Sequence, residues 1–182
     1  MNSSAQPRLR ASLALAVGLA FALPACGATD PVVVDGSDGT PYKVSATATF
    51  PTKQQVANQQ TLKVTVRNEE ASRTIPDVAV VIRGLQRKLP AGDNGNGKIA
   101  DRRRPIWIVD EPPSGGQTAI SNTWALGPLP AGEERSFSWK LTPTIAGKHE
   151  IVWSVAGDLV EDGPVEATGG DADGAFDVTV AR

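Results

Sequence analysis

The side chains that most often carry catalysis are scarce in this chain. It contains one histidine, His149, and one cysteine, Cys26. This excludes an intrachain disulfide, a Cys2His2-type zinc site and a copper site built from two His and a Cys. Any acid–base or triad scheme must use His149, and no Gly-x-Ser-x-Gly or Ser-x-x-Lys motif accompanies it. His149 alternates in phase with Ile151 and Trp153 and so lies on the same face of the expected strand. We therefore interpret it as a partly buried structural side chain and expect no enzyme.

Residues 92–101 form a run rich in glycine and in side-chain oxygens, GDNGNGKIAD. Calcium binds about six to eight oxygens. Four side chains here would supply some of them: Asp93, Asn94, Asn96 and Asp101. An EF-hand has acids or amides at the third and fifth places, where this run has Gly95 and Gly97. The alternatives are a Ca2+ site and a Gly-Asn turn without a ligand, and the spacing favours the turn.

Three consecutive arginines follow this run directly: Arg102, Arg103 and Arg104. Guanidinium groups pair well with phosphate, so they are candidate contacts for lipid head groups or an anionic polymer of the teichoic type. The alternative is that the run lies in solvent beside a hairpin and that Asp101, Asp110 and Glu111 neutralise its charge. We favour this second interpretation, because charge runs usually face solvent.

Two tryptophans in the same region are candidate binding residues, Trp107 and Trp124. An exposed indole face would stack on sugars or on a partner chain. Burial in a satellite core is the alternative. Ile106 and Ile108 flank Trp107 and need apolar cover, which favours burial.

Alternating apolar and polar residues predict the elements that must position these groups. Period-two alternation is typical of strands with one dry and one wet face. The expected strands lie at 44–50, 62–66, 78–82, 106–109, 122–126, 137–141, 151–155 and 176–180. Turn residues separate them, and no amphipathic helix is expected. We therefore predict an all-β fold, a single immunoglobulin-like antiparallel sandwich of seven or eight strands, with Trp139 and Trp153 meeting between its sheets.

Length and charge favour a single domain with an appendage. The 182 residues carry 18 Lys and Arg against 20 Asp and Glu, a net charge of −2. Nucleic-acid binding needs a basic surplus, so we expect no nucleic-acid partner. The domain is expected at residues 43–182, with an insertion at about 84–123. Compact sandwiches rarely carry so long a connection unless it binds something or orders itself.

Residues 1–25 have the plan of a secretory signal peptide. Arg8 and Arg10 precede an acid-free apolar stretch from Ala11 to Ala25. Fifteen helical residues rise about 22 Å, less than the ~30 Å hydrocarbon core, so a permanent membrane span is not expected. The polar, Gly- and Pro-containing residues 26–42 are expected to form a flexible tether.

The segment Leu23-Pro24-Ala25-Cys26 resembles the lipobox of bacterial lipoproteins, with Pro24 where a small residue is usual. The resemblance implies that the Cys26 thiol receives a diacylglyceryl group and that Cys26 becomes the first residue after cleavage. An incidental cysteine beside an ordinary cleavage site is the alternative. Two acyl chains anchor firmly. We therefore expect an extracytoplasmic protein held at the outer face of the cell membrane.

Residues 44–180 resemble the bacterial immunoglobulin-like modules grouped with CARDB domains. The resemblance rests on a V-x-V-x-N strand at Val64–Asn68, a P-x-G turn at Pro130–Gly132 and an F-x-W strand at Phe137–Trp139. His149 stands where these modules usually have Tyr. Such modules are generally non-catalytic, which implies a binding or adhesion module that contacts an unknown envelope protein or polymer. The alternatives are a passive spacer without a ligand and a calcium-dependent surface module.

Overall fold

The computed structural model describes residues 39–88, 100–114, 120, 122–157, 159 and 163–182. These residues form twelve β-strands in two five-stranded sheets and one two-stranded sheet, and none of them belongs to a helix. Accordingly, no helix long and apolar enough to span a bilayer occurs in the described part of the chain.

The first sheet is built around the long antiparallel pairing of two central strands. Its strands, in spatial order, are β11 (Val165–Ala167), β1 (Tyr42–Thr49), β3 (Gln60–Asn68), β9 (Glu134–Pro143) and β7 (Trp107–Glu111). β3 pairs with β9 from Gln60↔Leu141 to Arg67↔Glu134. β11 lies parallel to the start of β1, so the sheet is mixed.

The second sheet is built around the hairpin of β10 and β12. Its spatial order is β2 (Lys53–Gln55), β12 (Asp173–Ala181), β10 (Gly147–Ala156), β4 (Ala79–Arg83) and β8 (Thr123–Ala125). β2 pairs in parallel with the end of β12. The strands at both edges have only three residues, and short edge strands limit unwanted pairing with other chains.

The core lies between the two sheets because each long strand turns one face inward. Leu62, Val64 and Val66 of β3 are fully buried while their neighbours are exposed or half-buried. Across the core, Trp124 of the second sheet meets Trp139 of the first edge to face, with ring centroids 5.5 Å apart. Trp153 is buried in the second sheet. Such edge-to-face pairs are a favoured packing of aromatic rings.

The all-β sandwich expected from the sequence is confirmed, and the structure refines it. Each of the eight expected strand segments overlaps a strand of the structure. The expected total of seven or eight strands is too low, because four short strands, β2, β5, β6 and β11, show no alternation that a sequence could reveal. The segment 84–123 is also more than an insertion. It supplies β7 to the first sheet and leads into β8 of the second.

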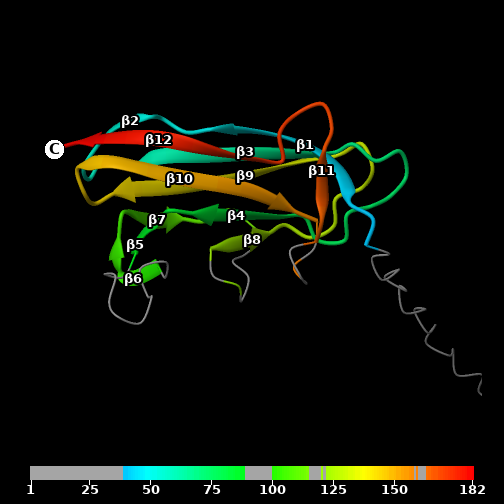
Figure 1. The fold of residues 1–182 in the computed structure, drawn as a ribbon, viewed down its shortest axis with the longest axis horizontal. Coiled ribbons are helices and arrows are strands. Elements are labelled where there is room, and N and C mark those ends of the chain that lie inside the picture. Colours follow the sequence, from blue (N-terminus) through cyan, green and yellow to red (C-terminus); the bar gives the residue numbers. More distant parts are fainter. Residues whose placement is uncertain (1–38, 89–99, 115–119, 121, 158, 160–162) are drawn as a thin grey trace, which may run out of the picture. The chain divides into compact units, whose positions relative to one another are not determined.

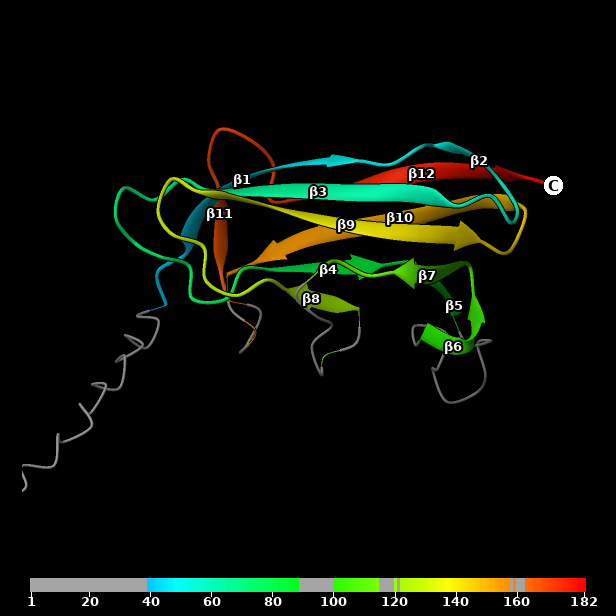
Figure 2. The ribbon, with the colours of Figure 1, turned by 180° about the vertical axis from the view of Figure 1, so that it is seen from behind.

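The two ends of the sandwich differ in what they carry. The chain enters β1 at one end, and the C-terminus and the β5–β6 pair lie at the other (Figures 1 and 2). The strand register gives the same arrangement. Arg67 pairs with Glu134 at the start of β9, near the chain entry, whereas Trp107 pairs with Pro143 at the end of β9. Nine rises of β9 separate the two ends by about 30 Å.

Candidate functional site

The arginine run lies on two short strands that stand outside both main sheets. β5 (Gln86–Lys88) and β6 (Ala100–Pro105) pair with each other. They leave the second sheet at Gly84, whose φ is +91°. A Cβ there would come within 2.3 Å of the Glu150 carbonyl oxygen, so only glycine fits this turn. We call the five cationic residues of this pair the basic ribbon: Arg87, Lys88, Arg102, Arg103 and Arg104.

A large bulge concentrates the cationic residues of the ribbon. Gln86 pairs with Pro105, and Lys88 pairs with Ala100. One residue of β5, Arg87, therefore faces four residues of β6, 101–104. A bulge turns the side chains of the bulged strand in different directions. Arg87 and Lys88 thus join the arginine run in space, which the linear sequence did not reveal.

The charge of the ribbon is poorly compensated by nearby acids. Residues 83–104 hold seven of the 18 Lys and Arg and two of the 20 Asp and Glu, a net charge of +5 (7 − 2). The other residues of the chain carry −7 (11 − 18). Lys88 and Arg103 are exposed. Among the described residues, the ion pairs involve Arg104 but not Arg87, Lys88 or Arg103.

Asp101 organises the bulge. Its Oδ1 accepts a hydrogen bond from the backbone N–H of Arg103 at 3.0 Å, and its Oδ2 lies 3.9 Å from Nε of Arg104. The Asp101 side chain is 14% exposed and that of Arg104 is 42% exposed. The expected neutralisation of the run by Asp101, Asp110 and Glu111 is only partly correct. Asp110 accepts hydrogen bonds from Thr142 and Gln59, and Glu111 pairs with Lys140.

Trp107 and Trp124 are not surface binding residues, which corrects their candidacy. They are 1% and 2% exposed. Trp107 packs edge to face against Phe50, and Trp124 against Trp139. The physical reason is that β7 and β8 are strands of the main sheets, so their inward positions fill the core. The satellite-core alternative was closer, although the cluster they join is the main one.

His149 is partly buried, as expected from the strand face that it shares with Ile151 and Trp153. Its ring lies edge to face against Trp107, with centroids 5.7 Å apart. Its Nε2 lies 3.1 Å from the carbonyl oxygen of Ile145, so Nε2 carries the proton and donates. His149 also borders an open depression of about 490 Å³ between β10 and β12. Its other lining residues are Lys148, Glu150, Asp177, Val178 and Thr179.

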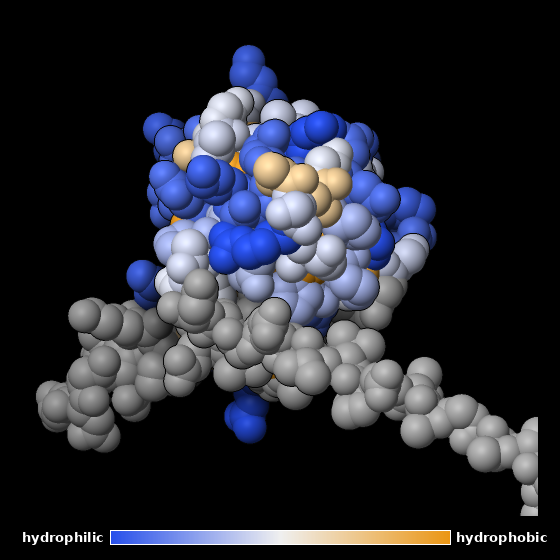
Figure 3. Space-filling view, turned by 90° about the vertical axis from the view of Figure 1, so that its right-hand side faces the viewer, coloured by the Kyte–Doolittle hydropathy of each residue, from blue (hydrophilic) through white to orange (hydrophobic). Residues whose placement is uncertain are grey.

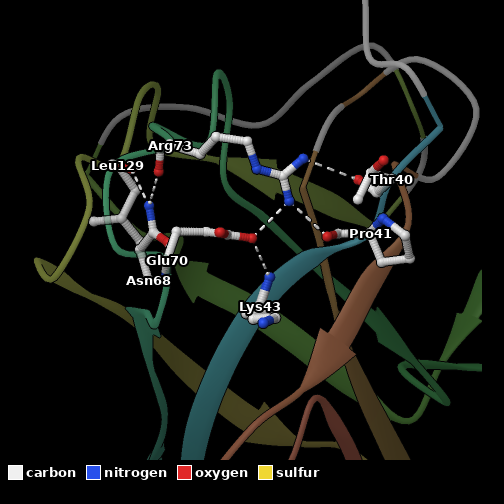
Figure 4. A network of polar contacts seen from close by, with 7 residues as sticks. All are labelled: Thr40, Pro41, Lys43, Asn68, Glu70, Arg73 and Leu129. Carbon is white, nitrogen blue, oxygen red and sulfur yellow. Dashed lines mark hydrogen bonds and ion pairs between the residues drawn. The ribbon is translucent and has the colours of Figure 1, made fainter.

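A polar network holds the chain where it enters the sandwich (Figure 4). The Arg73 guanidinium donates to the carbonyl oxygens of Thr40 and Pro41 and to the Glu70 carboxylate. It also lies 4.5 Å from the centroid of the Tyr42 ring. Glu70 accepts a further hydrogen bond from the backbone N–H of Lys43. The hydrogen bond from Arg73, followed by that from Lys43, lowers the pKa of Glu70 below its usual value.

The buried side chain of Asn68 supports this network from below. Its Nδ2 donates to the carbonyl oxygens of Arg73 and Leu129, and its Oδ1 accepts from the N–H of Glu70. Asn68 is fully buried, so these bonds offset the cost of removing the amide from water. The described surface at this end is predominantly hydrophilic (Figure 3). Sequence analysis identified Asn68 only as part of a strand motif and missed Glu70 and Arg73.

Several predicted site residues lie outside the described residues. These are Cys26, Asp93, Asn94 and Asn96, and the side chain of Arg102 is not described either. Of the four expected calcium ligands, only Asp101 is described, and its carboxylate contacts Arg103 and Arg104 instead. Within the described ranges, no group of three or more His, Cys, Asp or Glu residues is placed to hold a metal ion.

Comparisons with known proteins find similarity among solved structures. No known protein family and no curated protein matches the sequence. Among solved structures, the solution structure of a Pyrococcus furiosus CARDB domain is 18% identical, with a TM-score of 0.48, over 78% of this chain and 98% of that one. The crystal structure of that domain with di-metal ions is 20% identical, with a TM-score of 0.42, over 76% and 92%. A Clostridium perfringens cohesin module is 11% identical, with a TM-score of 0.45, over 78% and 98%.

Proposed function

We propose that this chain is a lipid-anchored, non-catalytic binding module at the outer face of a bacterial cell membrane. The basic ribbon is its contact surface for another component of the envelope. The observation that carries this proposal is the net positive charge around the ribbon, +5 for residues 83–104 (7 − 2), on a chain that is otherwise acidic. Charge of one sign concentrated on a protruding element steers and orients partners of the opposite sign.

The anchoring part of the proposal rests on the lipobox-like segment ending at Cys26. Where the described chain enters the sandwich, Arg73 binds the backbone of Thr40 and Pro41, directly before β1. Within the sandwich, the ribbon lies at the end opposite this entry, about 30 Å away.

A passive spacer is the second candidate function. It is favoured by the burial of all four tryptophans, because aromatic side chains are the commonest anchors of protein interfaces. The two candidates differ in the ribbon. A spacer does not depend on its charge, whereas a binding module loses its partner when that charge is reversed.

Crosslinking on intact cells tests the binding function. The full chain and its Arg87→Glu/Arg103→Glu variant are expressed at equal levels, crosslinked and recovered from membranes. A Lys53→Glu/Lys63→Glu variant makes the same charge change on exposed strand positions outside the ribbon. We expect loss of the crosslinked partner in the ribbon variant alone. Equal recovery from all three proteins would favour the spacer.

The lipid anchor is tested separately by intact-mass spectrometry of the protein extracted from membranes. The expected product begins at Cys26 and carries a diacylglyceryl group, and Cys26→Ala is expected to release the protein from the membrane fraction. An unmodified product, or a Cys26→Ala protein that stays in the membrane fraction, would contradict the proposed anchor.

A further inference from the structure

The surroundings of the basic ribbon exclude some ligand chemistries. Every described tryptophan and tyrosine is buried, as are Phe50 and Phe137, and Phe176 is half-buried. The described part of the surface therefore offers no broad aromatic face on which a sugar ring would stack. The large apolar side chains that are exposed, Ile108 and Ile120, lie outside β5 and β6. Recognition at the ribbon thus depends on charge.

The cationic positions of the ribbon lie close together on two facing strands. The arginines of β6 occupy three successive positions, 102–104, over about 7 Å, and Arg87 and Lys88 lie on β5 opposite them. A single phosphate pairs with one or two guanidinium groups, so a chain that carries several phosphates engages more of these cations at once. Four of the five cations are arginines, whose forked N–H groups fit the oxygens of a phosphate group.

Lipid head groups and phosphate polymers offer the same phosphate chemistry. The residues outside 83–104 carry a net charge of −7 (11 − 18), and residues 150–181 contain eight acids and no Lys or Arg. A flat anionic surface that approached the ribbon would also approach these acidic parts of the domain, whereas a single polymer chain contacts the ribbon alone.

From these observations we infer that the basic ribbon binds a linear phosphodiester polymer rather than a lipid surface. This inference rests on the proposed function, because it names the partner class of the same surface. Arg87 and Arg103 contact successive phosphates across the bulge, and Asp101 holds the bulge open by binding the Arg103 N–H.

The test measures binding of the full chain, purified in nonionic detergent, to synthetic poly(glycerol phosphate) of defined length by calorimetry at low and at physiological salt. We expect saturable binding that weakens with salt, because ion pairs with a polyanion are screened. Arg87→Glu/Arg103→Glu is expected to weaken it at least tenfold, and Lys53→Glu/Lys63→Glu less than threefold. Circular dichroism and urea unfolding confirm that both variants are folded.

Two further arms separate the alternative ligands. Poly-glutamate of equal charge is expected to bind at least fivefold more weakly, and equal binding would overturn the phosphate assignment. Vesicles with anionic phosphatidylglycerol are expected to bind more weakly per phosphate than the polymer, and stronger vesicle binding would overturn the choice of a polymer over a lipid surface. Absence of polymer binding, or equal loss in both variants, would overturn the inference altogether.

These outcomes are distinguishable from failure of the proposed function. The calorimetric assay does not depend on the lipid at Cys26, so an unmodified Cys26 would contradict only the anchor. A crosslinked envelope partner that depends on the ribbon, together with no polymer binding, would uphold the binding module and overturn only the polymer.

Discussion

The indole N–H of Trp107 donates a hydrogen bond of 2.9 Å to Oε1 of Gln54, and both side chains are buried. The Nε2 of Gln54 in turn donates to the carbonyl oxygen of Pro51. A residue of β7 in the first sheet is thus joined to a residue of β2 in the second. The bond links the two sheets near the end that carries the basic ribbon.

This bond predicts different costs for the same substitution at two tryptophans. Trp107→Phe leaves the buried Oε1 of Gln54 without its donor, which costs about 1–3 kcal/mol beyond the lost volume. Trp124→Phe removes an N–H that has no acceptor among the described residues. We expect Trp107→Phe to lower the free energy of unfolding by about 1–2 kcal/mol more than Trp124→Phe, measured by urea denaturation. Equal losses would show that the Gln54 bond contributes nothing.

Gly84 is predicted to be intolerant of any side chain. An alanine Cβ would overlap the Glu150 carbonyl oxygen, and the φ of +91° is unfavourable for alanine. We expect Gly84→Ala to lower the free energy of unfolding by roughly 3 kcal/mol. Gly127→Ala is the matched control, because φ there is +75° and nothing lies within 4 Å of the added Cβ. Its expected cost is about 1 kcal/mol, so equal costs would contradict the close approach at Gly84.

The sequence predicted the long strands because their alternation records burial directly. Phe137, Trp139 and Leu141 alternate with polar residues, and all three are fully buried. The same rule failed for three-residue strands such as β2 and β5, where an alternation is too short to recognise. These strands exist because neighbouring strands offer free backbone groups, as β12 does to β2. That information lies in the tertiary structure.

The candidate site was predictable only in part, for a similar reason. The charge of Arg103 and Arg104 is visible in the sequence, but the position of Arg87 opposite them depends on the irregular register of β5 and β6. For Trp107 the flanking isoleucines favoured burial correctly, but local context does not show that β7 pairs with β9 and so places Trp107 in the main core rather than in a satellite core.

Glu70 makes the entry network sensitive to acid. Its pKa is lowered mainly by the Arg73 hydrogen bond, so the fold favours its ionised form. Its contribution to stability is complete above the usual carboxyl pKa and is lost as the pH falls through the lowered value. We therefore expect Glu70→Gln to lower the free energy of unfolding by about 1 kcal/mol at pH 7 and by less with each step toward pH 3.

Urea unfolding at several pH values measures this difference, and Glu133→Gln is the control because Glu133 lies exposed in the turn before β9. A difference between wild type and Glu70→Gln that stays constant from pH 7 to pH 3 would show that the Glu70 charge is not involved.

Asp101 distinguishes the ribbon proposal from the calcium alternative. Asp101→Asn keeps an oxygen that accepts the Arg103 N–H but removes the acid paired with Arg104. If the ribbon binds a phosphodiester polymer, the variant gains one net positive charge on an intact bulge, so its affinity for poly(glycerol phosphate) should rise about two- to fivefold. Asp101→Ala also removes the acceptor that holds the bulge, so we expect its affinity for the polymer to be lower than that of Asp101→Asn.

A calcium site would behave oppositely, because losing a carboxylate ligand weakens Ca2+ binding. Calorimetry of each variant with the polymer and with CaCl2 separates the polymer site from the calcium site. If the wild type gives a Ca2+ binding heat that Asp101→Asn abolishes, and the polymer affinity is unchanged, Asp101 belongs to a metal site.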